Sequence, residues 1–197
     1  VMIDILSEIY DLKDEKRTGW ELRHVEYPET VASHSWGVSF LALNFMPEDL
    51  DSEKVLKLCI VHDVAEADVG DIAHRAIDAD EETSADKKQE LERQAIERYS
   101  RDLNSDLDEL WREYDGKVSE EACFVKDMDL IDMCLQALKY EDQHRYDPDE
   151  ENENFQEYEH MDEFFATTRP RLKTEKATEM FQRIKSRYES VKDSRSS

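Results

Sequence analysis

The sequence predicts an all-α protein. Only 4 glycines and 4 prolines occur among its 197 residues, so few positions favour turns or interrupt helices. Apolar residues recur every three or four positions, which is the period of a helix rather than that of a strand. A chain of this length can bury one substantial core and is short for two full domains. We therefore expect one domain over 1–197, with its core at about 5–141 and C-terminal helices at 160–192 packed on that core.

Three helices are expected in the first 70 residues. Their bounds are about 2–14, 30–46 and 51–70, with a loop at 16–28 after the first. Pro47 ends the second helix, because proline cannot continue a helix. Asp51 or Ser52 can cap the third helix, and Gly70 is typical of the residue that follows a helix.

The rest of the chain is predicted to alternate between charged and apolar helices. We expect an exposed acidic loop at 78–90 leading into a charged helix to about Tyr99, helices at 107–114 and 120–140, an acidic loop or frayed insertion at 147–159, and a final helix at 173–191. The segment 120–140 is the most apolar of these, so its helix should lie at the centre of the fold.

The charge of the chain limits its partners. The formal net charge is −24, from 50 acidic and 26 basic residues, and the acids are spread along the sequence. Such a surface repels nucleic acids and anionic membranes, so we expect neither as a partner. Molar salt shortens the Debye length to about 3 Å and removes most of this self-repulsion. The composition therefore suggests the hypothesis of a halophilic source.

Cysteine usage indicates a reducing compartment. Cys59, Cys123 and Cys134 lie in apolar helical patterns without a CxxC spacing, which is typical of small buried side chains rather than of disulfides. No apolar run approaches the roughly 20 residues that span a bilayer, and the first residues lack the pattern of a signal peptide. We expect a soluble, cytoplasmic protein.

Ionisable residues occupy apolar stripes on three of the predicted helices. They are His34, the pair His62-Asp63, and Asp129. Burial of such groups costs several kcal/mol unless they are paired or bound to a metal. Taken singly, a buried histidine is more often part of a hydrogen-bonded core than a ligand, and periodicity does not distinguish Asp129 from Asp127 or Asp132. Three such sites on three helices could nevertheless converge.

The order of these residues resembles the H…HD…D signature of the HD-domain superfamily. Three segments carry a likeness to its 5'-deoxyribonucleotidase branch: Glu29-Thr-Val-Ala-Ser-His34-Ser, Val61-His-Asp-Val-Ala-Glu-Ala-Asp-Val-Gly-Asp71-Ile and Val125-Lys-Asp-Met-Asp129. The likeness covers approximately 5–141 and is weaker in the C-terminal helices. It implies an HD-domain helical bundle with a central metal site, an enzyme that removes phosphate from nucleoside 5'-monophosphates, and a homodimer.

The resemblance implies that His34, His62, Asp63 and Asp129 bind the metal. Two imidazoles and two carboxylates suit Co²⁺, Mn²⁺, Fe²⁺, Ni²⁺ or Zn²⁺, and they leave two octahedral positions for water and a phosphate oxygen. A metal placed there can activate a water molecule for in-line attack on phosphorus. Only His74 lies between the His-Asp pair and Asp129, so the extra histidines of two-metal HD enzymes are missing. One metal per chain is expected.

Two further carboxylates receive catalytic roles from the same resemblance. Glu66 follows His62 by four residues and Asp63 by three, so a helix would present it on the same side as both. There it can hold or deprotonate the attacking water, and Asp71 can help to protonate the leaving 5'-oxygen. The structural alternatives are an exposed helix residue for Glu66 and a helix N-cap for Asp71.

Substrate binding requires positive charge. A divalent metal held by two aspartates and two neutral histidines has no net charge, so a phosphate dianion needs a nearby cation, for which Arg17 and Lys126 are candidates. Trp20 can contact the sugar or pack in the core, and the resembling family links a tryptophan of this loop to a preference for deoxyribose. Arginine and tryptophan are adjacent in the best-known bacterial pattern, whereas Thr18 and Gly19 separate them here, so both roles stay open.

Two other functions also stay open. One is an HD phosphohydrolase that acts on cyclic, triphosphate or alarmone nucleotides. Such pockets usually need extra basic and histidine residues, and the small size of this chain argues against them. A non-catalytic helical protein with a structural metal would not need Glu66, Asp71 and Arg17 together. The predicted function is therefore a metal-dependent phosphomonoesterase that acts on (deoxy)ribonucleoside 5'-monophosphates.

Overall fold

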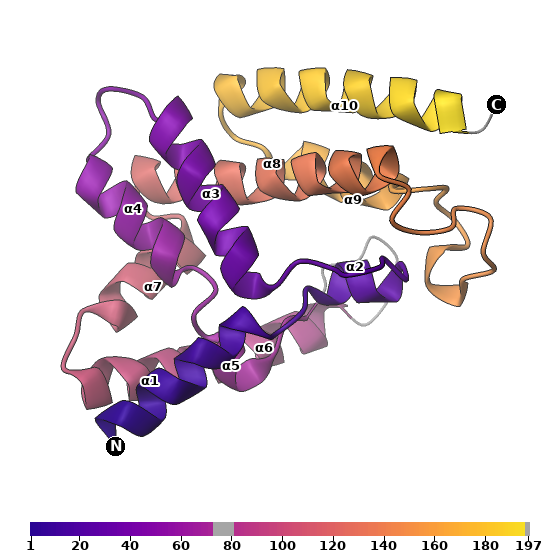
Figure 1. The fold of residues 1–197 in the computed structure, drawn as a ribbon. Coiled ribbons are helices and arrows are strands. Elements are labelled where there is room, and N and C mark those ends of the chain that lie inside the picture. Colours follow the sequence, from indigo (N-terminus) through magenta and orange to yellow (C-terminus); the bar gives the residue numbers. More distant parts are fainter. Residues whose placement is uncertain (73–80, 196–197) are drawn as a thin grey trace.

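The computed structural model describes residues 1–72 and 81–195, and for 81–85 it describes the backbone alone. Within these ranges every regular element is a helix, which confirms the expected fold class (Figure 1). The α-helices are α1 (Met2–Tyr10), α2 (Thr18–Leu22), α3 (Val31–Phe45), α4 (Ser52–Val61), α5 (Glu66–Val69), α6 (Glu81–Leu103), α7 (Leu107–Gly116), α8 (Glu120–Asp142), α9 (Asp162–Thr168) and α10 (Glu175–Arg195). The short 3₁₀ helices are η1 (Asp11–Lys13), η2 (Glu153–Phe155) and η3 (Arg169–Arg171).

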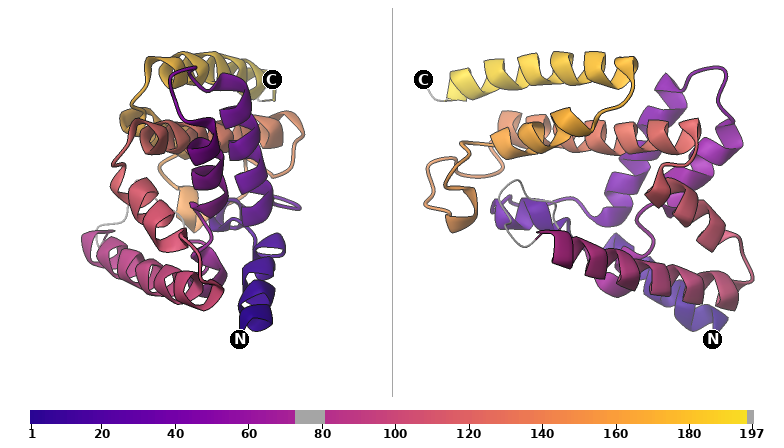
Figure 2. Two further views of the ribbon diagram at one scale, coloured as in Figure 1. Left: turned by 90° about the vertical axis from the view of Figure 1, so that its left-hand side faces the viewer. Right: turned by 180° about the vertical axis from the view of Figure 1, so that it is seen from behind.

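The helices pack in two groups, each with its own apolar core (Figures 1 and 2). In the larger group α10 lies along α8, α9 packs beside α8, and α3 crosses α8 next to α4. The smaller group contains α1, α5 and α6, and α7 contacts α6 on one side and α4 and α8 on the other. The chain passes from the larger group to the smaller one at 62–65, directly after α4.

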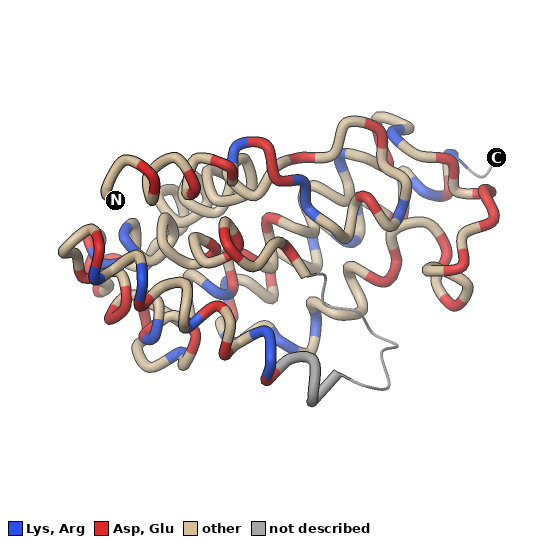
Figure 3. The backbone as a smooth tube through the Cα atoms, turned by 90° about the horizontal axis from the view of Figure 1, so that it is seen from below, with Lys and Arg blue, Asp and Glu red and all other residues tan. Residues whose placement is uncertain are grey.

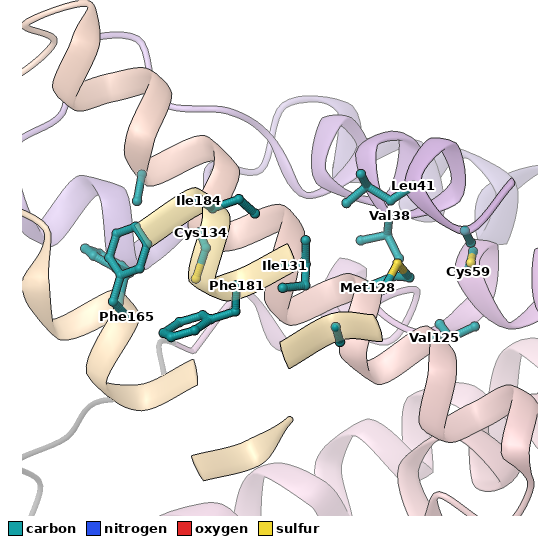
Figure 4. Close-up of a cluster of buried hydrophobic side chains, with 14 of the residues drawn as sticks. Val38, Leu41, Cys59, Val125, Met128, Ile131, Cys134, Phe165, Phe181 and Ile184 are labelled. Carbon is teal, nitrogen blue, oxygen red and sulfur yellow. The ribbon is translucent and has the colours of Figure 1, made fainter. Parts of the chain in front are cut away.

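Helix α8 is buried on several faces at once, as expected of the central helix. Figure 4 shows its Met128 close to Val38 of α3, and its Cys134 near Phe165 of α9 and Ile184 of α10. All five of these side chains are buried. A helix that is apolar nearly all round belongs in a core rather than on a surface, so α8 can carry side chains toward any site at the centre of the fold.

The third predicted helix ends earlier than expected. Helix α4 stops at Val61, and a turn over 62–65 precedes α5. In this turn Val64 N donates to Val61 O and Glu66 N donates to Asp63 O, each at 3.1 Å, which is the tighter bonding of a 3₁₀ helix. Adjacent residues of a regular α-helix point about 100° apart, so the tighter turn changes the directions of the His-Asp pair. Periodicity does not reveal such a change.

Part of the predicted loop at 16–28 is helical. Helix α2 lies within it, and Asp71 Oδ2 accepts a hydrogen bond of 2.6 Å from Thr18 N. The carboxylate therefore caps the helix from a distant segment. Gly19 lets this helix lie close to the Phe164 ring, from which a Cβ at this position would be only 3.2 Å away.

The predicted acidic loop at 78–90 is wrong over 81–90, where α6 is already helical. The residues of this stretch include glutamate, lysine, glutamine and alanine, which are good helix formers. Their polarity indicates exposure and does not by itself indicate a loop. The remaining positions of that prediction, 78–80, lie outside the described residues, and so does His74.

The acidic segment 147–159 is packed on the body rather than frayed. Asn152 Nδ2 donates to Leu22 O at 2.8 Å. Phe155, in η2, is buried, and its ring centroid lies 6.0 Å from that of Phe164. Contacts such as those of Asn152 and Phe155 thus hold a largely acidic segment to the body.

The cysteines are free, and two of the three are buried as expected. Cys59 and Cys134 are enclosed in the larger core, whereas Cys123 is only partly buried and its Sγ donates to Lys117 O at 3.6 Å. None of the helices in the described ranges is both long enough and apolar enough to span a bilayer.

Candidate metal centre and its pocket

Four donor atoms converge between α3, the turn after α4, and α8. Nε2 of His34 lies 3.4 Å from Nε2 of His62 and 3.1 Å from Oδ1 of Asp129. Oδ2 of Asp63 lies 3.2 Å from His62 Nε2 and 3.7 Å from His34 Nε2. The structure thus brings the four predicted ligands together from three separate segments.

The spacing of these atoms fits a divalent metal ion. Metal–donor bonds of about 2.1 Å place neighbouring octahedral ligands about 3.0 Å apart. Four of the six distances between these donors are 3.1 to 3.7 Å, which equals that spacing or slightly exceeds it. Donor atoms of His34, His62 and Asp129 all lie within 4.8 Å of one another. This group of imidazoles and carboxylates is therefore able to bind a metal ion.

The His34 ring is held by a carboxylate on its other side. Nδ1 of His34 lies 2.7 Å from Oδ2 of Asp132 on α8, which fixes the ring so that Nε2 faces the donor cluster. Gly37, one turn along α3, makes this contact possible, because a Cβ there would lie 2.2 Å from Asp132 Oδ1. The absence of a side chain at this position lets α3 and α8 approach closely enough for the pair to form.

The His62 ring is held by the backbone. Its Nδ1 donates to Cys59 O at 2.8 Å, so in the neutral ring Nε2 carries a lone pair toward the cluster. The ring also packs edge-on against Tyr114, with centroids 5.3 Å apart. Both imidazoles therefore present the same nitrogen to the site.

The cluster strongly favours positive charge at its centre. Burial and nearby Arg17 disfavour the imidazolium form of His34, but hydrogen bonds to Asp129 and Asp132 outweigh them and raise its pKa to about 10. Burial opposes ionisation of Asp63, yet His62 and His34 hold the pKa of this carboxyl below its usual value. Carboxylates that retain a proton on His34 this strongly also attract a divalent cation in its place.

Glu66 lies beside the cluster with one oxygen unused. It is buried, its Oε1 lies 3.7 Å from Lys88 Nζ, and its Oε2 has no hydrogen-bond partner within the described ranges. Burial and the charges of Asp63 and Asp71 raise the pKa of Glu66 well above its usual value. An inward carboxyl of this kind is suited to accept a proton, and the exposed-residue alternative is wrong.

Asp71 and Arg17 form a second polar group at the edge of the cluster. Nε of Arg17 lies 3.8 Å from Asp71 Oδ2, and its Nη1 lies 3.4 Å from Asp63 Oδ2. Burial alone would lower the pKa of Arg17, but Asp71, Asp63 and other acids outweigh it and raise the pKa, so the guanidinium stays charged. Asp71 does act as a helix cap, although the helix is α2, through Thr18 N.

Lys126 reaches the cluster from one turn before Asp129. Its Nζ lies 2.6 Å from Asp129 Oδ2, which also accepts a hydrogen bond of 2.9 Å from the Tyr114 hydroxyl. Burial opposes ionisation of Asp129, and Lys126 is the largest of the influences that nonetheless hold its pKa well below the usual value. Asp129 therefore presents Oδ1 to His34 while Oδ2 is fixed by two donors.

Trp20 packs in the core and also lines the pocket. Its side chain is 1% exposed, its ring centroid lies 4.3 Å from that of Phe164, and its Nε1 donates to Glu29 Oε1 at 3.0 Å. Core packing is thus an observed role of Trp20. A contact with a ligand would involve the part of the ring at the pocket wall.

The donor cluster opens on a pocket of about 890 Å³, counting the space open to solvent at its mouth. Its charged lining residues are Arg17, Asp63, Glu66, Asp71, Lys88, Lys126, Asp129, Glu163 and Arg171, and its large apolar ones are Trp20, Ile72, Leu130, Met133, Phe155 and Phe164. Such a lining suits a small ligand that has a charged part and a flat apolar part.

Some residues around the site are not among those predicted from the sequence. Asp132, which holds the His34 ring, follows Asp129 by three residues on one helix face, and this spacing is the signal that points to it. Lys88 lay in a stretch predicted to be an exposed loop. Arg171 and Phe155 come from beyond the segment that carries the family likeness, so no motif pointed to them.

The fold and the site together define an all-helical protein with a buried His/Asp centre able to hold a metal ion beside a small-molecule pocket. The chain belongs to the HD domain family, whose match covers residues 9–173. This confirms the resemblance drawn from the H…HD…D order.

Relatives and solved structures support the assignment. The chain is 38% identical to the mouse protein "5'-deoxynucleotidase HDDC2" over 141 residues, which are 72% of this chain and 70% of the mouse protein. It is 33% identical to "5'-deoxynucleotidase hdd1" of Schizosaccharomyces pombe, over 71% of this chain and 70% of that one. The crystal structure of the PH0347 protein from Pyrococcus horikoshii OT3 is similar, with a TM-score of 0.68, 29% identity, and coverage of 96% of this chain and 97% of that one.

Proposed function

We propose that this protein is a metal-dependent phosphomonoesterase that removes phosphate from nucleoside 5'-monophosphates, with deoxyribonucleotides preferred. The observation that carries the proposal is the position of Glu66, buried beside four convergent donor atoms with one carboxylate oxygen unpaired. A purely structural metal needs no such group. The names of the relatives, which are 5'-deoxynucleotidases, support the substrate class.

The proposed ligands are His34, His62, Asp63 and Asp129, which would hold one divalent ion per chain. Co²⁺, Mn²⁺, Fe²⁺, Ni²⁺ and Zn²⁺ all suit this donor set. When bound, the ion supplies Lewis-acid stabilisation of the phosphoryl oxygens during in-line displacement. Asp132 and the carbonyl of Cys59 serve as positioning groups, because they fix the tautomers of the two imidazoles.

Glu66 and Asp71 are proposed to move the protons. Glu66 Oε2 accepts a proton from the attacking water, because it is the unpaired carboxylate oxygen beside the donor cluster. Asp71 in its protonated form gives its proton to the leaving 5'-oxygen and is left as the carboxylate. Its side chain lies at the pocket wall and is held by Thr18 N, so its position does not depend on the ligand.

Arg17, Lys126 and Trp20 are proposed to contact the substrate. Arg17 directs Nη1 and Nε toward Asp63 and Asp71, which leaves Nη2 to donate to a phosphate oxygen. Lys126 lies beside Asp129 in the same pocket. Trp20, backed by Phe164, forms an apolar wall against which a deoxyribose packs more closely than a ribose with its extra hydroxyl.

Phosphate release from a panel of nucleotides tests this function. The panel contains deoxyribonucleoside and ribonucleoside 5'-monophosphates, a triphosphate and a cyclic nucleotide, each with and without added Co²⁺ or Mn²⁺ in molar KCl. Metal-stimulated turnover of the monophosphates, fastest for the deoxy forms, is the expected result. Turnover confined to triphosphates or cyclic nucleotides, or no turnover of any nucleotide, contradicts the proposal.

We also propose that the chain forms one domain and assembles as a homodimer through the exposed face of α3. Trp36, Phe40 and Leu43 on this face are 68%, 52% and 61% exposed, and the rings of Trp36 and Phe40 stack with centroids 5.4 Å apart. Helix α3 contains no Asp, Glu, Lys or Arg in a chain that is 39% charged. Because a two-fold interface places identical surfaces together, this neutral face avoids the repulsion that acidic faces would suffer.

A salt-rich, reducing cytoplasm is the proposed setting. Acidic residues are distributed over the whole visible length of the chain (Figure 3), and the net charge is −24. Salt at molar concentration screens repulsion between them. Cys59 and Cys134 are free and buried, as expected where thiols remain reduced. Equal stability in dilute buffer and in molar KCl would contradict the halophilic part of this proposal.

A further inference from the structure

Four cationic side chains line the pocket, and three of them already have carboxylate partners. Arg17 lies 3.4 Å from Asp63, Lys126 lies 2.6 Å from Asp129, and Lys88 lies 3.4 Å from Glu92. Their charges largely serve to offset the acids around the donor cluster. A phosphate dianion that enters the pocket would therefore share each of these cations with a carboxylate.

The fourth cation, Arg171, has no hydrogen bond or ion pair within the described ranges. It is partly buried, belongs to η3, and lines the same pocket as Asp129 and Lys126. Its five N–H donors therefore have no partner among the described residues and can bond a ligand in the pocket.

The backbone next to Arg171 is fixed to the helix that carries Asp129. Oδ1 of Asp127 accepts from Lys173 N at 2.9 Å, and Oδ2 accepts from Thr174 N at 2.7 Å. Asp127 is buried on α8, two residues before Asp129. The position of Arg171 is thus tied to that of the donor cluster, which is what a preorganised binding group requires.

We propose that Arg171 is a substrate-binding residue that holds the phosphate of the nucleotide with its guanidinium. The inference rests on the proposed function and deepens it, because it names the group that provides uncommitted positive charge. It would also give the segment between α9 and α10, where η3 lies, a direct part in the site. The planar guanidinium can donate two parallel hydrogen bonds to phosphate oxygens.

The chain provides a matched control in the same 3₁₀ helix. Arg169 is exposed and lines a separate groove against α10. We would compare Arg171→Gln, Arg171→Lys and Arg169→Gln with wild type in the metal-loaded protein. The two glutamine variants each remove one positive charge, at positions two residues apart, and Arg171→Lys keeps the charge but loses the planar guanidinium. Circular dichroism and metal analysis establish that each variant is folded and loaded.

Two measurements test the inference. The first is KM and kcat for a deoxyribonucleoside monophosphate, and the second is the binding of inorganic phosphate by calorimetry, which needs no turnover. Arg171→Gln should raise KM, and the Kd for phosphate, by about 10- to 100-fold. This is the range for a lost hydrogen bond to a charged group. Arg171→Lys should fall between it and wild type, and Arg169→Gln should match wild type.

The outcomes separate this inference from the proposed function. If phosphate binding is equally strong in Arg171→Gln and Arg169→Gln, the assignment of Arg171 is wrong even when monophosphates are hydrolysed. If wild type hydrolyses no monophosphate, the proposed function fails, and phosphate calorimetry still decides whether Arg171 binds this anion. If Arg171→Gln does not fold, Arg171→Lys decides, since unchanged phosphate binding and KM in that variant overturn a bidentate role.

Discussion

Oδ2 of Asp132 lies 2.7 Å from Nδ1 of His34, on the opposite edge of the ring from the nitrogen that faces Asp129. We predict that Asp132→Asn weakens metal affinity by about 10- to 100-fold, the usual effect of removing a group that orients a ligand. Activity should return when excess Co²⁺ or Mn²⁺ is added. Metal titration of this variant beside Asp142→Asn, an exposed change on the same helix, checks the prediction, which unchanged affinity would refute.

Glu66→Gln should separate metal binding from turnover. The change keeps the size of the side chain but removes a carboxylate that can take a proton, so we expect a loss of about 10²- to 10⁴-fold in kcat. Metal content should stay at the wild-type level. Kinetics and metal analysis are to be run together with Glu109→Gln, an exposed control. A Glu66→Gln enzyme with full activity would remove Glu66 from the proposed chemistry.

Gly37→Ala is expected to damage the site without touching a ligand. The added Cβ would lie 2.2 Å from Asp132 Oδ1, so α3 and α8 must separate or Asp132 must leave His34. We expect a lower melting temperature and weaker metal binding, with a stability loss of about 1–3 kcal/mol, as for other overpacked positions. Thermal unfolding with and without metal measures both effects. Asn44→Ala, on the exposed end of α3, is the control, and a Gly37→Ala protein that behaves like it contradicts the argument.

Trp36→Glu should abolish self-association. A charge at the centre of a two-fold interface faces its own copy, so the repulsion counts against every dimer. Light scattering after size-exclusion chromatography should give the mass of a dimer for wild type and of one chain for the variant. Tyr27→Glu places the same charge on a residue that is 84% exposed outside α3 and should leave the mass unchanged. A wild-type protein that is monomeric at all concentrations rules out the α3 interface.

Glu8 is predicted to link stability to pH in the smaller helical group. Hydrogen bonds from Arg98 and Tyr99 lower the pKa of Glu8 below its usual value of 4.5, although partial burial acts in the opposite direction. A carboxyl whose pKa is lowered by folding stabilises the protein above its unfolded pKa, and this contribution is lost as pH falls through the folded pKa.

The test compares wild type with Glu8→Gln by denaturant unfolding in molar KCl at several pH values. Glu8→Gln should be less stable at pH 7, by under about 1 kcal/mol because the pair is partly exposed. The difference should shrink as pH falls below 4.5. Glu48→Gln, at an exposed position, controls for the change in net charge. A difference that stays constant with pH would show that Glu8 does not act through its charge.

The family likeness gave more of the site than periodicity did. Local spacing predicted most helices, and the order of His34, His62-Asp63 and Asp129 predicted which ionisable residues meet. Periodicity could not show that α4 ends at Val61, because the change to tighter bonding is set by local hydrogen bonds rather than by apolar spacing. It also could not place Arg171, since its approach to the pocket depends on the tertiary contact between Asp127 and the start of α10.

Four side chains within seven residues of α8 each make a different contact at the site. Lys126 contacts Asp129, and Asp127 contacts the start of α10. Asp129 faces Nε2 of His34, and Asp132 faces its Nδ1. A single deletion inside this stretch would rotate every later side chain by about 100°. Substitutions there can alter one interaction at a time, whereas a change of length would disconnect all of them together. The segment at 147–159 is not part of this helix, so a change in its length would leave the register of α8 intact and would reach the pocket through Phe155.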